Sequence, residues 1–323
     1  MTVADLPFPG APALLPDTRE PRFALGDDEP LAVGMQRLVV EQVDDGLDLI
    51  RNGPDLDTTV HELRKALKRV RAVLRLMRGE LGRFRYRQEN IVLRDTARTW
   101  SAVRDAAVMA AVARDLVDGG EGSDNLVGRR LVVMLEERHL DASQALTADR
   151  SLRMDTVTTL LCFRARVSRF PVVGDGAFPD RFASIRPGML RIARRAAAGM
   201  EEAQVLPTAH RLHEWRKDVK YLRHHIEVLE PMWPDLLAAV AQRLTELGDV
   251  LGDEHDRAQL GRLIATDHTL VPDERSRRRL LGAIEGRRAT LQTEAFALSA
   301  SILSPSPDAL VDRVEAAWGY RRR

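Results

Sequence analysis

The stretch HELRKALKRVR at residues 61–71 recurs as HEWRKDVKYLR at residues 213–223. The two stretches share six of eleven residues at a constant offset of 152 positions. A repeat of this kind indicates that one half of the chain is a copy of the other. In both copies the basic residues return every three or four positions, which is typical of one face of an α-helix.

Positive charge is concentrated in these two places. From His61 to Arg78 seven Lys or Arg stand against a single Glu, and residues 210–225 (HRLHEWRKDVKYLRHH) carry a net +3 and four histidines. The whole chain has a formal net charge of only +1. Two local concentrations of cations are therefore hidden in a nearly neutral protein, and such concentrations attract anions.

Helical geometry places the basic residues of each copy on one side. At about 100° per residue, the first copy's basic side chains fall within roughly a third of the circle, and they are His61, Arg64, Lys65, Lys68, Arg71 and Arg75. Apolar residues occupy the opposite arc, from Leu63 to Met77 in the first copy and from Trp215 to Leu229 in the second. The pair Thr59 and Glu62 has the spacing of a capping box and predicts that the first helix starts there.

Two interpretations of these faces are open. Charged faces on amphipathic helices are often merely solvated. However, Lys65, Lys68 and Arg71 repel one another by a few tenths of a kcal/mol per close pair. Because both copies keep this unfavourable arrangement, the repeat favours an anion-binding site.

The rest of the sequence predicts an all-α protein. No stretch alternates apolar and polar residues as a half-buried strand would, and 44% apolar residues are enough for a large core. Turn signals divide the chain into a proline-rich, irregular leader (1–29), a first helical bundle (30–170), a linker (171–180, PVVGDGAFPD), a second bundle (181–305), and a C-terminal helix with a basic tail (306–323).

The same survey predicts an intracellular location. The first 20 residues lack the basic start of a signal peptide, and no run of 18 apolar residues could span a membrane. The single cysteine, Cys162, excludes an internal disulfide and suits a reducing compartment. We therefore expect a cytoplasmic protein that does not contact membranes.

A second pair of matching elements follows each basic stretch. Asp105 lies in WSAVRDAAV (100–108) beside Arg104, and Asp256 lies in LGDVLGDEHDRAQL (247–260) beside His255. The two aspartates follow their motif histidines by 44 and 43 residues. We expect Asp105 and Asp256, with Arg104, to support the site by orienting cations of the facing helix.

The pattern His-x-x-Arg-Lys-x-x-Lys-x-x-Arg, present twice in a helical chain and followed each time by such an element, resembles the CHAD domain over about residues 30–305. The resemblance implies two pseudo-symmetric four-helix bundles whose motif helices face each other across a central basic groove. It also implies binding of inorganic polyphosphate and, in bacteria, association with polyphosphate granules. The implied ligand residues are His61, Arg64, Lys65, Lys68 and Arg71 in the first copy and His213, Arg216, Lys217, Lys220 and Arg223 in the second, to which the basic faces add Arg75 and His224.

The copies also differ from each other, and this makes the halves electrostatically unequal. Tyr221 stands where the first copy has Arg69, and Ser101 stands where the second copy has Gly252. The E-x-E-x-K strand motif of the triphosphate-tunnel domain, which many relatives carry, is absent from the chain. The sequence therefore predicts a binding protein without catalytic residues, resident metal or cofactor.

Two alternatives remain. Asp249, Asp253 and Asp256 share a helical face and could hold magnesium in a phosphohydrolase or a polyphosphate-modifying enzyme. Non-specific nucleic-acid binding is the second, although only 5% of residues are aromatic and single-stranded nucleic acid is usually bound by stacking on aromatic rings.

Overall fold

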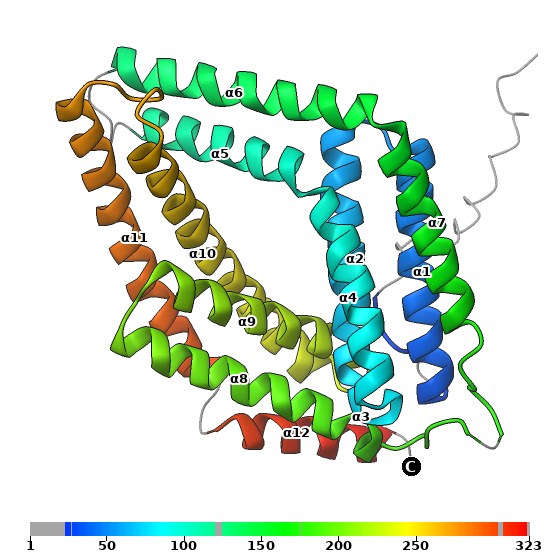
Figure 1. Ribbon diagram of the computed structural model, residues 1–323. Helices are drawn as coiled ribbons and strands as arrows, with labels where there is room; N and C mark the ends of the chain where they lie inside the picture. Colours follow the sequence, from blue (N-terminus) through cyan, green and yellow to red (C-terminus); the bar gives the residue numbers. More distant parts are fainter. Residues whose placement is uncertain (1–22, 27, 120–124, 175, 303–305, 322–323) are drawn as a thin grey trace, which may run out of the picture.

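The computed structural model describes residues 23–26, 28–119, 125–174, 176–302 and 306–321, and every regular element in these ranges is a helix (Figure 1). The all-α prediction is confirmed. The α-helices are α1 (Leu31–Asn52), α2 (Leu56–Leu76), α3 (Arg78–Leu81), α4 (Arg83–Thr99), α5 (Ser101–Asp118), α6 (Asn125–Ala148), α7 (Arg150–Val167), α8 (Arg186–Val205), α9 (Ala209–Leu229), α10 (Pro234–Thr266), α11 (Glu274–Ile302) and α12 (Pro307–Arg321), with short 3₁₀ turns η1 (Phe182–Ser184) and η2 (Glu230–Met232). None of the described helices is long and apolar enough to cross a membrane.

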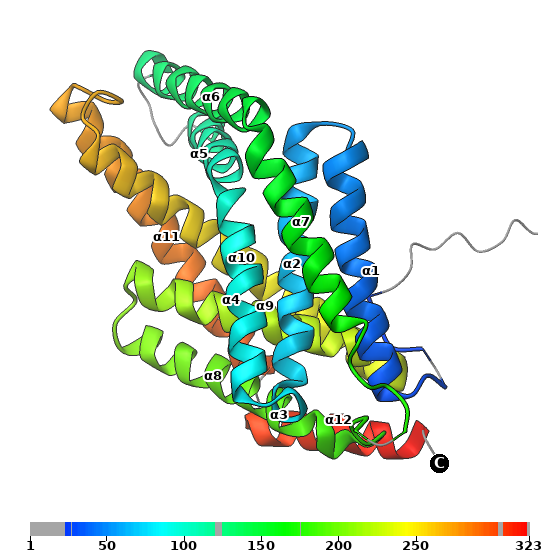
Figure 2. The ribbon, with the colours of Figure 1, turned by 45° about the vertical axis from the view of Figure 1, so that its right-hand side comes forward.

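The same order of packed helices occurs twice along the chain. α1 packs on α2 and α5 on α6 in the first half, and α8 packs on α9 and α10 on α11 in the second (Figure 2). The halves differ at Trp100, a buried residue whose indole Nε1 donates a hydrogen bond to Thr156 Oγ1 at 3.0 Å and which separates α4 from α5. The corresponding helix of the second half, α10, runs without a break. A pseudo-two-fold relation between two four-helix bundles remains a prediction.

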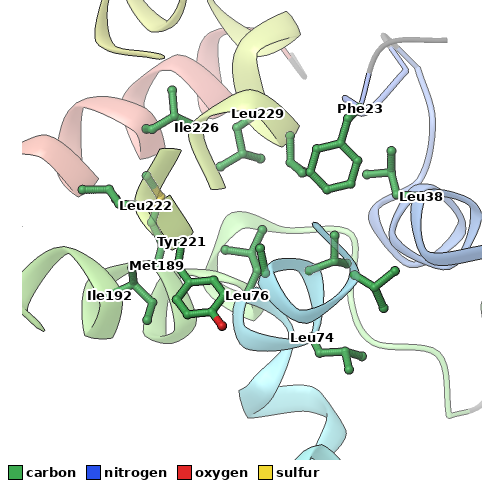
Figure 3. Packing of buried hydrophobic residues seen from close by; sticks show 14 of the residues in the cluster. Phe23, Leu38, Leu74, Leu76, Met189, Ile192, Tyr221, Leu222, Ile226 and Leu229 are labelled. Carbon is green, nitrogen blue, oxygen red and sulfur yellow. The ribbon is translucent and has the colours of Figure 1, made fainter. Parts of the chain in front are cut away.

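One hydrophobic core joins the two halves. It contains residues of α1, α2 and α7 together with residues of α8, α9 and α12. Figure 3 shows its centre, where Leu76 of α2 lies on the side of Tyr221 of α9 and Leu74 points to the other side of α2. A second, smaller core lies where α5 and α6 meet the far part of α10 and α11. Because the main core crosses the sequence repeat, it holds α2 and α9 in a fixed relation.

The predicted turns match the helix ends. The chain passes from α7 to η1 between Val167 and Phe182, which includes the predicted linker. α1 ends at the sequence Asn-Gly-Pro (52–54), and α9 begins just after Leu-Pro (206–207), two sequences that commonly end helices. The final predicted helix is present as α12.

The predicted start of the first motif helix is wrong. α2 begins three residues before the predicted capping box, because Asp55 is its N-cap and accepts a hydrogen bond from the Thr58 backbone N–H at 2.8 Å. The end of the predicted irregular leader forms no helix in its described residues, but part of it packs against the main core. Phe23 and Leu25 are buried in the main core, and the Leu25 N–H donates to the Val228 carbonyl of α9 at 2.9 Å. Apolar side chains at these positions outweigh the prolines around them, while residues 1–22 of the leader lie outside the described residues.

Candidate anion-binding site

The two motif helices, α2 and α9, bury the arcs that the sequence predicts. In α2, Leu63, Leu67 and Val70 are fully buried. In α9, Trp215, Leu222 and Leu229 are fully buried. The Thr208 side chain caps α9 by accepting from the Arg211 backbone N–H at 3.3 Å. Each helix is therefore fixed by one side, and its basic side is left for other contacts.

α2 and α9 also contact each other directly near their C-terminal ends. The His225 Nε2 atom of α9 lies 3.0 Å from the Ala72 carbonyl of α2. Burial lowers the pKa of His225 to about 3, so the imidazole is neutral at physiological pH and its Nε2 can donate to the carbonyl. Beside this bond, the Arg75 guanidinium of α2 stacks over the Tyr221 ring of α9, 3.8 Å from its centroid.

This contact brings the basic sides of the two helices together. We call their central residues the basic cluster, and it consists of Arg64, Lys68 and Arg71 of α2, Arg216, Lys220 and Arg223 of α9, and Arg104 of α5. Six of these residues were predicted as ligands, and Arg104 was predicted as a supporting residue.

The two lysines show how closely the cations are placed. Burial, followed by the charges of Arg216, Arg64, Arg104 and Arg71, lowers the pKa of Lys68 from 10.5 to about 8. Burial and the charges of Arg216, Lys68 and Arg223 lower the pKa of Lys220 to about 7, with Asp249 opposing them. Each lysine thus responds to cations of the other half. The basic cluster is one electrostatic unit.

Neutral acceptors hold the cations of the first half. Arg64 Nη1 donates to the Ala97 carbonyl of α4 at 2.6 Å. Arg71 Nε and Arg75 Nη1 both donate to the Asn90 Oδ1 atom of α4, at 3.1 and 3.0 Å. Backbone carbonyls and amides orient a guanidinium without cancelling its charge, so the positive potential of this half is retained.

Carboxylates surround the cations of the second half. The charges of Asp256, Asp249 and Asp253 of α10 all act on Arg216, whose pKa is nevertheless lowered because burial dominates. Gly252 makes room for this arginine, since a Cβ atom there would lie 3.3 Å from Arg216 Nη2. Burial also raises the pKa of Asp256, and Arg216 opposes the shift. In the first half Asp105 is exposed, and its charge acts on Arg64.

Other predicted ligands lie at the margin of the basic cluster. Lys65 is 2.9 Å from Glu62, and Lys217 is 2.7 Å from Glu214, so the same i, i+3 ion pair occurs in both copies. His61 is about half exposed, and burial followed by the charge of Arg104 lowers its pKa. Arg75, held between Asn90 and Tyr221, uses its guanidinium to join the halves.

Three histidines line a pocket of about 560 Å³ beside the N-terminal part of α9. The ring centroids of His213 and His255 lie 4.2 Å apart, and the other polar lining residues are His210, Gln259, Arg262 and Thr266. The pKa of His255 is lowered to about 3 by burial and by the neighbouring His213, and the pKa of His213 is lowered by burial and by Lys217. In the free protein the imidazoles of His213 and His255 are therefore neutral at pH 7.

The prediction that His224 contributes to the basic face is wrong. Its side chain is 3% exposed, its Nδ1 atom lies 2.7 Å from Glu227 Oε2, and its ring meets Phe23 edge-on at 6.0 Å. The ordered segment before α1 covers this part of α9 and removes His224 from solvent.

Comparison with known proteins agrees with this geometry. The sequence model of the CHAD domain family matches residues 37–265. The chain belongs to the CHAD domain family. The solved CHAD domain from the plant Ricinus communis is similar over 92% of this chain and 96% of its own, with a TM-score of 0.56 and 19% identity. No curated protein matches the chain.

The structure of this CHAD domain protein gives no support to the metal-site alternative. Asp249 and Asp253 are exposed on α10, while Asp256 is partly buried against Arg216. Among the described residues, no group of three or more His, Cys, Asp or Glu side chains is arranged to hold a metal ion.

Sequence reasoning missed one positioning residue of the CHAD domain, Asn90. It lies on α4, outside both motif helices, and its amide oxygen joins Arg71 to Arg75. A signal was present in the sequence, because Arg87, Asn90, Arg94 and Arg98 recur at helical spacing after the first motif.

Proposed function

We propose that this CHAD domain protein binds inorganic polyphosphate at the basic cluster and does not hydrolyse it. The observation that carries the proposal is that cations of α2 and α9 meet in one partly buried cluster, where the charge of Arg216 acts on Lys68 and the charge of Lys68 acts on Lys220. Cations held this close destabilise one another until an anion neutralises them. A polyanion that contacts both helices would restore the full charge of the two lysines. It would be bound more strongly because the charged lysines attract it.

The chemistry of the cluster favours phosphate over nucleic acid. Its donors are guanidinium and ammonium groups, which match phosphate oxygens. Tyr221 lies beside the cluster but is buried under Arg75. A single-stranded nucleic acid would need exposed aromatic rings on which its bases could stack, whereas polyphosphate has no bases. A cytoplasmic protein of this kind would be recruited to polyphosphate granules.

Calorimetric titration with polyphosphate of defined length tests the proposal, with heparin and single-stranded DNA of matched charge for comparison. We expect tight binding of polyphosphate and a loss of at least about tenfold in affinity for Arg64→Ala with Lys68→Ala, and for Arg216→Ala with Lys220→Ala. Arg129→Ala with Arg130→Ala removes the same charge from exposed positions on α6 and is the matched control.

Three results would contradict the proposal. Equal affinity for all three polyanions would indicate non-specific charge attraction. Equal binding by the cluster variants and the α6 control would place the site elsewhere. Release of phosphate from long polyphosphate in the presence of magnesium, lost on Asp249→Asn with Asp253→Asn, would establish the hydrolase alternative.

A further inference from the structure

α4 carries a row of arginines that belongs to neither motif. Arg83, Arg87, Arg94 and Arg98 fall, together with Asn90, within about 80° of one another at 100° per residue. All four arginines are exposed. Arg94 pairs with the exposed Asp95 at 2.8 Å, and no ion pair is formed by the other three among the described residues. We call these four residues the α4 arginine row.

The α4 arginine row adjoins the basic cluster. Asn90, in the middle of the row, accepts from Arg71 of the cluster. The Ala97 carbonyl, next to Arg98, accepts from Arg64. Arg94 is close enough for its charge to lower the pKa of Arg71. The row therefore continues the positive surface of the cluster along α4, over about 22 Å from Arg83 to Arg98 at 1.5 Å per residue.

The second half has the opposite charge at the corresponding place. α10, which packs against α9 as α4 packs against α2, exposes Glu246, Asp249 and Asp253 on one face. The charges of Asp249 and Asp253 act on Arg216. A polyanion leaving the basic cluster thus meets cations along α4 and carboxylates along α10.

We propose that the α4 arginine row is a second binding surface for long polyphosphate, which leaves the basic cluster along α4 and avoids α10. The inference rests on the proposed function of the cluster. Exposed arginines on one helical face give a flexible polyanion a series of equivalent contacts, and each contact releases counterions. A short anion such as tripolyphosphate occupies the cluster alone and gains nothing from the row.

The test compares two ligands on one variant. Arg87→Gln, Arg94→Gln and Arg98→Gln together should weaken binding of long-chain polyphosphate about tenfold at low salt, and should lower the slope of log affinity against log salt by about 2, by analogy with single-stranded nucleic acids. Affinity for tripolyphosphate should change less than about twofold. Arg129→Gln, Arg130→Gln and Arg279→Gln remove three exposed arginines from α6 and α11 and should leave both affinities close to wild type.

The outcomes separate the inference from the proposed function. The row is not a second surface if the α4 variant binds long-chain polyphosphate as tightly as the α6/α11 control does. The same follows if its affinity for tripolyphosphate falls by the same factor as its affinity for long chains. In either case the cluster can still bind polyphosphate. If wild-type protein binds neither ligand, both proposals fail. Circular dichroism checks the fold, and Arg83→Gln with Arg98→Gln, which touches no ion pair of the described residues, should show a smaller loss of the same kind.

Discussion

Replacing Lys68 and Lys220 by arginine should remove the pH dependence of polyphosphate binding. In the free protein burial and nearby cations hold their pKa values at about 8 and about 7. Phosphate favours the charged form and raises both pKa values, so binding takes up protons and affinity falls as pH rises through the values of the free protein. Arginine stays protonated throughout this range.

The magnitude follows from the two pKa values. At pH 7.5 a lysine of pKa about 7 is about three-quarters neutral and one of pKa about 8 is about one-quarter neutral, so binding should take up about one proton. If both pKa values return to about 10 in the complex, affinity falls roughly 60-fold between pH 7 and 8.5. Because the site is partly open to solvent, we expect a fall of at least about tenfold.

Titration calorimetry in buffers of different ionisation enthalpy measures both the affinity and the proton uptake. The Lys68→Arg, Lys220→Arg protein should lose less than about threefold over the same range and take up well under one proton. His61→Gln with His213→Gln should keep the wild-type dependence, because the pKa values of these imidazoles are lowered from 6.5 in the free protein and would have to rise by more than about one unit in the complex before they took up protons above pH 7.5. A flat wild-type profile, or an unchanged slope in the lysine-to-arginine variant, would refute the reasoning.

Three further predictions concern the frame and the charge balance of the site. Gly188→Ala should destabilise the protein by about 1–3 kcal/mol in urea unfolding, because a Cβ atom there would overlap a backbone carbonyl of α2; wild-type stability would show that the α2–α8 crossing is looser. Arg166→Leu should lower the free energy of unfolding by about 3–5 kcal/mol, since it leaves the buried Glu89 carboxylate without its bidentate partner, and Glu89→Gln should lower it by less. A larger loss for Glu89→Gln than for Arg166→Leu would contradict this account. Asp249→Asn with Asp253→Asn should raise polyphosphate affinity a few-fold at low salt and little at high salt, as the loss of two repelling charges requires; weaker binding of the variant would mean that these carboxylates help to hold the ligand.

Helical periodicity was enough to predict α2 and α9 and their buried sides. Leu63 and Leu67 in one helix and Trp215 and Leu222 in the other are fully buried, as their spacing requires. The spacing is informative because an apolar arc on a helix can be buried only on one side. The end of α1 and the start of α9 follow from the sequence as well, since proline cannot continue a helix and glycine adopts conformations that end one.

Periodicity could not predict which neighbour covers each helix. By angle, His224 lies on the basic side of α9, yet the segment around Phe23 covers it. The repeat indicates that this position is buried, because the residue equivalent to His224 in the first copy is the apolar Ala72, which is also fully buried. Ala72 and His224 lie at or beside the contact of α2 with α9, where side chains on the basic sides of the helices are covered by neighbouring elements. The role of Asn90 was hidden for the same reason, since it depends on how α4 lies against α2.

The two halves differ in the groups that surround the cations of the basic cluster. In the second half, Asp249, Asp253 and Asp256 offset the repulsion around Arg216, so this side contributes stability at the cost of positive potential. In the first half, the Ala97 carbonyl and the Asn90 amide orient Arg64 and Arg71 without cancelling their charge. Burial and the charges of neighbouring arginines lower the pKa of both residues, and a bound polyanion would relieve this repulsion. A protein with a total charge of +1 can therefore present a strongly positive surface, because three carboxylates of α10 act on Arg216 of the second motif helix, whereas Arg64 of the first has the charge of Asp105.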